Sequence, residues 1–259
     1  MGKLMNFEIY MDKLIADIYD KEHPLTTSDE DFVFYIDQCK KTSGDILELA
    51  CGTGRLIVPI LEAGCSIEGL DLSGPMLNIL EQKLKTKRLT TQLYQKNMAD
   101  FKIDKKYQLI FIAVSSFFIL NGQEEQINCL KCCRDHLVDG GRLIIDCLID
   151  SYERNMQRSG ELKYFNKLED NDKIVLIYVS SKMNTIQQRE NIIFHYQIYS
   201  SDGILEKTVI RHLPWRWIHP DEFKLMAQIA GFSSLKLFGG YHLGPLEESC
   251  HEMVAILGC

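Results

Sequence analysis

Two stretches near the N-terminus repeat apolar residues at the spacing of an amphipathic helix. Residues 11–19 and 32–39 place an apolar side chain every three or four positions, which aligns these side chains along one helix face. The polar stretch between them holds Pro24 and is expected to be a loop. We therefore predict that residues 1–44 form a helical lid in front of the main domain.

From residue 45 onward, short apolar runs alternate with amphipathic stretches. The runs predict strands near residues 45–49, 66–72, 92–95, 108–114 and 142–147. The stretches between them predict helices over residues 55–63, 73–84 and 124–137, and residues 139–141 predict a turn. Because the strands are apolar at almost every position and alternate with helices, we expect a parallel sheet covered on both faces over residues 45–150.

The pattern changes again after residue 150. Between residues 162 and 214 apolar and polar side chains mostly alternate, which is typical of strands with two different faces. Ser201-Asp202-Gly203 is a hairpin turn signal inside this region. We predict an antiparallel insert of three or four strands over residues 151–216.

The last segment, residues 217–259, returns to the earlier pattern. A helix is expected over residues 220–230, and two strands near residues 233–238 and 252–257. We predict that these strands form a hairpin that adds one antiparallel strand to the core sheet.

Charge and cysteine content narrow the class of protein. The 259 residues carry 29 Lys+Arg against 36 Asp+Glu, a formal net charge of −7, so we expect no nucleic-acid partner. No apolar run reaches the roughly 18 residues of a membrane helix, so we expect no membrane association. Nine irregularly spaced cysteines without a secretion signal predict free thiols and a cytoplasmic location. The grouped Cys129, Cys132 and Cys133 are expected to be core residues, and no metal site is predicted.

One motif carries the chemistry. Glu48-Leu-Ala-Cys-Gly-Thr-Gly54 joins a predicted strand to a helix, and Asp71 ends the next strand. Gly52 and Gly54 let a ligand approach the backbone, and an acid at the end of the second strand can accept hydrogen bonds from both ribose hydroxyls. A dinucleotide fingerprint would have Gly or Ala at position 57, where this chain has Ile57. The motif therefore predicts an adenosine-type ligand, and disfavours a nicotinamide oxidoreductase.

Three segments together resemble a known family. Residues 48–54, Leu70-Asp-Leu-Ser73 and Asn97-Met-Ala-Asp100 look like the signatures of class I S-adenosylmethionine-dependent methyltransferases. The similarity is close over residues 45–147 and looser through 217–232. Within the family, the chain resembles the small-molecule subgroup that includes sugar N,N-dimethyltransferases of antibiotic pathways. The resemblance implies a Rossmann-like, seven-stranded, mostly parallel sheet with helices on both faces, and S-adenosyl-L-methionine as the cofactor.

The resemblance also implies a cofactor site. The loop Ala50 to Arg55 would pass under the methionine part, Asp71 would hold the ribose, and Asn97 would meet the adenine amino group. Glu48 would organise the cofactor loop, with a structural carboxylate that caps nearby N–H groups as the alternative. The full set expected at the cofactor is Tyr19, Glu48, Ala50, Cys51, Gly52, Thr53, Gly54, Arg55, Asp71, Leu72, Met76, Asn97, Met98, Ala99, Val114 and Ser115.

Acceptor residues are harder to assign from the sequence. His212 lies where the insert returns to the sheet, and is predicted to bind the acceptor or remove its proton, with a structural histidine as the alternative. Trp215 and Arg216 could line an acceptor pocket or cover the seam of the insert. Tyr10 in the lid and Phe117 after a strand are further candidates, and a core role is equally open for Phe117.

We thus predict transfer of a methyl group from S-adenosylmethionine to a nitrogen or oxygen of a small-molecule acceptor. The sulfonium already activates the methyl group, so in-line displacement mainly requires the acceptor atom to be positioned behind it. Alternatives are a methyltransferase acting on protein or RNA, and a nucleotide-binding module without turnover. The exposed strands of the insert also leave a homodimer through the insert open.

Overall fold

The computed structural model describes residues 13–23, 29–149, 160–170 and 173–259. Their contacts divide the chain into two compact units. The larger unit holds residues 13–149 and 218–259, and the smaller unit holds residues 160–217. Tyr10 lies outside the described residues.

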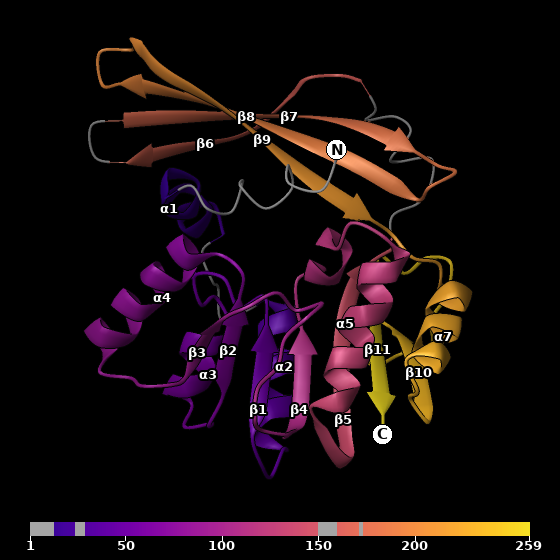
Figure 1. The fold of residues 1–259 in the computed structure, drawn as a ribbon. Coiled ribbons are helices and arrows are strands. Elements are labelled where there is room, and N and C mark those ends of the chain that lie inside the picture. The colour runs from indigo at the N-terminus through magenta and orange to yellow at the C-terminus, as the bar shows by residue number, and fades with distance from the viewer. Residues whose placement is uncertain (1–12, 24–28, 150–159, 171–172) are drawn as a thin grey trace. The chain divides into compact units, whose positions relative to one another are not determined.

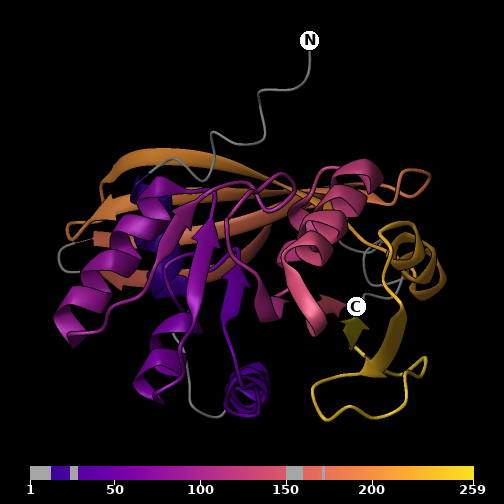
Figure 2. The same ribbon diagram turned by 60° about the horizontal axis from the view of Figure 1, so that its bottom comes forward.

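The larger unit is built on a seven-stranded sheet with the order β10-β11-β5-β4-β1-β2-β3, whose strands lie side by side in Figures 1 and 2. Its strands are β1 (Ile46–Leu49), β2 (Glu68–Asp71), β3 (Leu93–Gln95), β4 (Tyr107–Ile112), β5 (Leu137–Leu148), β10 (Ser234–Gly239) and β11 (Glu252–Gly258). Strand β11 pairs antiparallel with both β5 and β10, while the other neighbouring pairs are parallel. The predicted, mostly parallel seven-stranded sheet with one antiparallel strand is confirmed.

Helices cover both faces of this sheet. They are α1 (Lys13–Glu22), α2 (Glu30–Lys40), α3 (Ile57–Glu62), α4 (Gly74–Lys87), the short 3-10 helix η2 (Ser116–Ile119), α5 (Gln123–Asp135) and α7 (Pro220–Ile229). Helices α2 and α5 lie on opposite faces of the sheet (Figures 1 and 2). Among the described helices, none combines the length and apolar character that crossing a bilayer requires. All nine cysteines are free thiols, and Cys129 and Cys133 are buried in α5.

Strand β5 differs from its predicted form. It begins at Leu137 and includes the segment Asp139–Gly141, which the sequence predicts to be a turn. Gly140 has a φ of 75°, and the pairing of β4 with β5 shifts register between Tyr107 and Leu109. The glycine pair therefore produces an irregularity within a longer strand, because the chain resumes pairing immediately after it.

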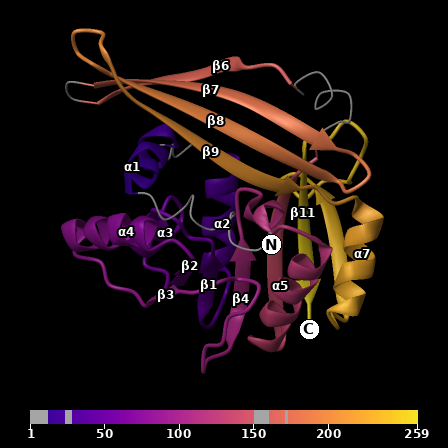
Figure 3. The same cartoon turned by 45° about the horizontal axis from the view of Figure 1, so that its top comes forward.

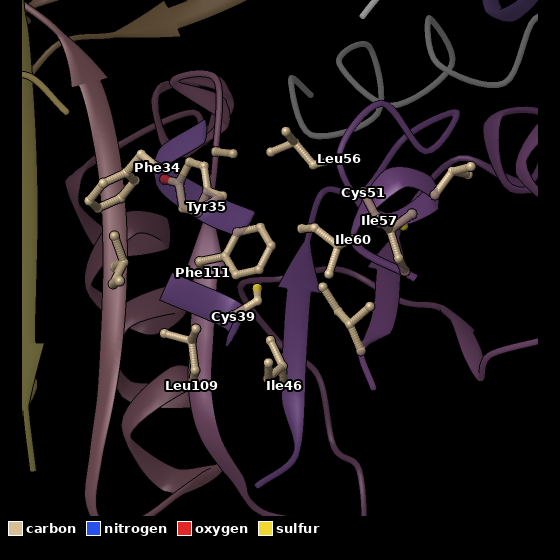
Figure 4. Packing of buried hydrophobic residues seen from close by; sticks show 14 of the residues in the cluster. Phe34, Tyr35, Cys39, Ile46, Cys51, Leu56, Ile57, Ile60, Leu109 and Phe111 are labelled. Atoms are coloured by element: carbon tan, nitrogen blue, oxygen red, sulfur yellow. The ribbon is translucent and has the colours of Figure 1, made fainter. Parts of the chain in front are cut away.

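The core between α2 and the sheet fixes that helix in place (Figure 4). The rings of Tyr35 and Phe111 stack with their centroids 4.6 Å apart, and both side chains are fully buried. Phe34, Cys39 and Ile46 belong to the same cluster. Burying one large apolar side chain contributes roughly 1.5–3 kcal/mol to stability. This packing holds the acidic start of α2 beside the carboxyl ends of β4 and β5, where the cavity described below lies.

The smaller unit is an antiparallel sheet with the strand order β6-β7-β8-β9 (Figure 3). Its strands are β6 (Lys163–Asp170), β7 (Lys173–Asn184), β8 (Arg189–Ser200) and β9 (Leu205–Arg216). The predicted turn at residues 201–203 joins β8 to β9, and Gly203 adopts a φ of 79° there. The predicted antiparallel insert is therefore confirmed, with four strands.

The start of α4 provides a first test of the fold. The Ser73 hydroxyl accepts a hydrogen bond from the Met76 N–H at 3.2 Å, as an N-cap does. Ser73→Ala should lower the free energy of unfolding by about 1 kcal/mol. Thr86→Ala removes an exposed hydroxyl of the same helix that donates to the Gln82 carbonyl, and should change it little. Urea denaturation compares the two, and equal losses would contradict the capping role.

Candidate active site

The loop between β1 and α3 has three residues in the left-handed region. Ala50, Gly52 and Gly54 have φ values of 57°, 54° and 89°. A Cβ at Gly54 would lie 2.4 Å from a methyl carbon of Leu80, so packing excludes any side chain there. A Cβ at Gly52 would have no atom within 4 Å. The loop therefore packs tightly on its inner side at Gly54 and leaves open space at Gly52.

Asp71 ties this loop to the end of β2. One of its carboxylate oxygens accepts the Gly52 N–H at 2.8 Å, and the other accepts the Ser73 N–H at 2.7 Å. Burial raises the pKa of Asp71, and these hydrogen bonds oppose the rise. Each oxygen retains lone-pair capacity for a further donor, as recognition of a ribose diol requires. Leu72, the next residue in the chain, is half-buried, and Met76 in α4 is buried.

Two charged side chains flank the loop. Glu48 is buried on β1, and burial, reinforced by the negative charge of Asp71, raises its pKa. Its Oε2 atom has no hydrogen-bond partner among the described residues. Arg55 binds Asp31 and also donates to Asp29 at 3.0 Å. An orphaned buried oxygen, the open space at Gly52 and the spare lone pairs of Asp71 all fit a polar ligand lying on this loop.

Helix α1 is fastened to the same loop. The Thr53 hydroxyl donates to the Asp20 carboxylate at 2.6 Å, and the same carboxylate oxygen pairs with Lys83 of α4. The Lys83 ammonium also donates to the Thr53 carbonyl at 3.0 Å. Tyr19 is half-buried, and its ring stacks on His23 with centroids 4.3 Å apart. The described part of the predicted lid thus holds the loop through one shared carboxylate.

The turn after β4 forms the next part of the site. Val114 and Ser115 have φ values of 55° and 54°. The Asp146 carboxylate accepts their N–H groups at 3.1 and 3.0 Å, and accepts the Tyr35 hydroxyl at 2.5 Å. The Ser115 hydroxyl accepts the Leu148 N–H at 2.9 Å. The turn is therefore fixed to β5 and to α2 by polar contacts.

A cavity of about 400 Å³ opens at this turn. It is lined by Asp29, Glu30, Asp31, Arg55, Val114, Ser115, Asp146, Leu148, Tyr241 and Glu252. Five carboxyl groups thus face one guanidinium, and that guanidinium is already paired with Asp29 and Asp31. Burial raises the pKa of Asp146 to about 6. Burial, together with the nearby acids, also raises the pKa of Glu252. The cavity carries excess negative charge and is suited to a cation.

Residues 46–141 match the family model described as "Methyltransferase domain". The chain contains a methyltransferase domain. The cypemycin N-terminal methyltransferase of a Streptomyces species is 25% identical over 95% of this chain and 96% of its own. The dTDP-3-amino-3,6-dideoxy-alpha-D-glucopyranose N,N-dimethyltransferase of Streptomyces fradiae is 25% identical, over 51% of this chain and 52% of that protein.

The fold of the methyltransferase is also found among solved structures. An S-adenosylmethionine-dependent methyltransferase from Clostridium acetobutylicum ATCC 824 superposes with a TM-score of 0.74 at 20% identity, covering 95% of this chain and 97% of the other. The prediction of a methyltransferase with a Rossmann-like fold is confirmed.

The remaining predicted residues of the methyltransferase occupy varied environments. The Asn97 side-chain carbonyl accepts the Ala99 N–H at 2.9 Å, so it is engaged within its own loop, where Met98 and Ala99 are buried. Phe117 is fully buried, and its ring packs edge-on against Phe223 with centroids 5.9 Å apart. Phe117 therefore lies in the core, and it is not among the residues that line the cavity.

Three predicted acceptor residues lie on β9 in the smaller unit. His212 is exposed, and its Nδ1 atom lies 3.2 Å from the side-chain nitrogen of Asn191. Trp215 is half-buried and Arg216 is buried. Their roles at the acceptor stay predictions.

Sequence reasoning missed the acidic cavity. Its carboxylates come from the start of α2, from β5 and from β11, which are distant in the chain. One signal was present: Asp146 interrupts the apolar run of β5, and a lone charge in a buried strand needs partners to offset its desolvation.

The two loop glycines predict opposite phenotypes. Gly54→Ala should destabilise the methyltransferase by several kcal/mol, because the new methyl overlaps Leu80 at a positive φ. Gly52→Ala should cost about 1–2 kcal/mol from backbone strain alone but abolish binding of S-adenosylhomocysteine, since it fills the open space. Thermal unfolding and calorimetric titration separate the two effects. A Gly52→Ala protein that binds normally would contradict the assigned ligand position.

The buried acids predict an unusual pH dependence of stability. The folded-state pKa of Asp146, about 6, lies above its ordinary value of 3.8, so the folded state takes up a proton first as pH falls. Lowering the pH from 7.5 to 5.5 should therefore increase the free energy of unfolding by about 1 kcal/mol through Asp146. Raising the pH through 6 should remove this gain. Denaturant titrations at both pH values test it, and Asp146→Asn should remove this contribution. If the unmodified protein instead became less stable than Asp146→Asn on lowering the pH from 7.5 to 5.5, the raised pKa of Asp146 would be contradicted.

Proposed function

We propose that this methyltransferase transfers a methyl group from S-adenosylmethionine to the nitrogen of a small amine. The loop Ala50–Arg55, Asp71 and the turn Val114–Ser115 would hold the cofactor, which supplies a methyl group on a positively charged sulfur. The cavity beside the turn would receive the amine. The single observation that carries the choice of nitrogen is the excess of carboxylates in that cavity.

Charge favours an amine over an alcohol as the acceptor. An amine arrives as an ammonium ion, which the carboxylates attract and orient. It must lose one proton before its nitrogen can attack, and an acid with a raised pKa, such as Glu252, is a better proton acceptor than an ordinary carboxylate. An alcohol would have to attack with alkoxide character, which the same negative charges oppose. The lining therefore supports nitrogen and disfavours oxygen.

The names of the two relatives support the same choice. The name of one specifies nitrogen, because it is an N,N-dimethyltransferase. The other is called an N-terminal methyltransferase, and the N-terminus of a peptide carries an amine. The latter protein matches nearly the whole chain, which makes a peptide N-terminal amine the second candidate acceptor. A peptide amine and an amino sugar present the same ammonium group, so both fit the carboxylates of the cavity. The net charge of −7 continues to disfavour RNA.

His212, Trp215 and Arg216, on β9 of the smaller unit, stay the predicted acceptor residues. Tyr10 stays a predicted acceptor contact, whereas Phe117, which is fully buried, takes the core role that the sequence also left open. A homodimer through the insert and a cytoplasmic location likewise stay predictions.

A substrate panel tests the proposal. Small primary amines, a peptide with a free N-terminus and matched hydroxyl analogues are incubated with S-adenosylmethionine, and methylation is read by mass spectrometry. We expect methylated amines and unmodified alcohols. Glu252→Gln should lower kcat/KM for an amine by about tenfold while leaving S-adenosylhomocysteine affinity unchanged. A hydrogen bond to a charged group contributes about 1.5 kcal/mol or more, and about 1.4 kcal/mol corresponds to a tenfold change.

Glu247→Gln provides the matched control, because Glu247 is exposed and does not line the cavity. It should behave like the unmodified protein in both measurements. Equal methylation of amines and alcohols, or equal effects of the two substitutions, would overturn the assignment of the acidic cavity to an amine.

A further inference from the structure

We propose that Asp146 is the positioning residue of this site: its ionised carboxylate holds the Val114–Ser115 turn in the conformation that binds the cofactor. The inference rests on the proposed function, in which that turn borders the methionine part of S-adenosylmethionine. Asp146 acts through the turn and does not itself need to touch the methyl group.

The turn requires an external constraint. Val114 and Ser115 both adopt left-handed φ values, which cost L-residues roughly 1–2 kcal/mol each. For a β-branched residue such as Val114 this conformation is a genuine outlier. The Val114 side chain is 44% exposed, so burial of that side chain in the core cannot be what holds it. Strained backbone of this kind persists only where its surroundings determine it strongly.

Asp146 supplies that constraint. Its side chain is 2% exposed, and its Oδ1 and Oδ2 atoms accept the N–H groups of Val114 and Ser115 at 3.1 and 3.0 Å. The Tyr35 hydroxyl donates to Oδ1 at 2.5 Å, and the stacking of Tyr35 on Phe111 fixes the position of that hydroxyl. An ionised carboxylate can accept all three hydrogen bonds, whereas a protonated one must give up acceptor capacity and find an acceptor for its own proton.

The surroundings of Asp146 bring this change into an accessible pH range. Burial raises its pKa to about 6, against the opposing hydrogen bonds from Tyr35 and the turn. The titratable groups that face it are Tyr35 and Asp31 of α2, Tyr241 after β10, Glu252 of β11 and its neighbour Cys147. Acidification through pH 6 should therefore release the turn and weaken ligand binding.

Binding of S-adenosylhomocysteine, followed by calorimetric titration from pH 5.0 to 8.0, tests this without any acceptor. If only the ionised form binds, the association constant should fall about tenfold between pH 7.5 and 5.0. Its midpoint, the pH at which it is half its value at high pH, should lie near 6. Tyr35→Phe removes a hydrogen bond that lowers the pKa of Asp146, so the midpoint should move to higher pH. Asp146→Asn should bind weakly, with little dependence on pH.

Tyr107→Phe is the matched control. Tyr107 is also fully buried and donates its hydroxyl to a carboxylate, Glu68, at 2.7 Å, but it lies at the opposite end of β4. It should lose comparable stability and keep the midpoint of the unmodified protein. If the pH dependence of binding came from Glu252 and not from Asp146, Tyr35→Phe would have the same midpoint as the unmodified protein.

The outcomes separate the two proposals. No binding at any pH would overturn the proposed function itself. Binding that is independent of pH, or a midpoint that is equal in Tyr35→Phe and the unmodified protein, would overturn only the role of Asp146. If Asp146→Asn fails to fold, the comparison of the two tyrosine variants still decides the question, because each changes only one hydroxyl.

Discussion

The ionised state of one buried carboxylate constrains the arrangement of the whole site. Asp146 lies within an apolar strand, where an isolated charge is costly unless donors surround it. Those donors come from helix α2 and from the turn after β4, so the helix and two neighbouring strands must be in register for the charge to be tolerated. The stack of Tyr35 on Phe111 extends this requirement into the hydrophobic core. The packing of the core therefore also determines the geometry of the site in this protein.

The parallel sheet explains why the remaining parts of the site meet. Strands β1, β2 and β4 run in the same direction, so the glycine loop, Asp71 and the Val114–Ser115 turn all emerge at one edge. Strand β11 runs the other way and therefore brings its first residue, Glu252, to the same edge. A parallel strand would place its last residue at this edge. Because β11 is antiparallel, its first residue, the carboxylate Glu252, lies there instead.

Local signals made much of this arrangement predictable from the sequence. The glycine loop, the Ser73 cap and Asp71 depend on neighbouring residues, and apolar runs were enough to locate the strands. The acidic cavity was not predictable, because Asp31, Asp146 and Glu252 meet only through the sheet order and the docking of α2. The segment Asp139–Gly141 misled the prediction for a related reason: its two glycines signal a turn locally, whereas pairing with β4 continues the strand.

In the proposed reaction, the negative charge of the cavity lies on the side of the acceptor. Methyl transfer moves positive charge from the sulfur of the cofactor to the nitrogen of the acceptor, so groups on the acceptor side stabilise the transition state more than the ground state. Arg55 is already neutralised by Asp29 and Asp31, which leaves Glu30, Asp146 and Glu252 to offset the charge that develops on nitrogen. Raised pKa values are the cost of placing acids there without a cation. The same field that raises the pKa values of these carboxylates is the field that an amine acceptor would need.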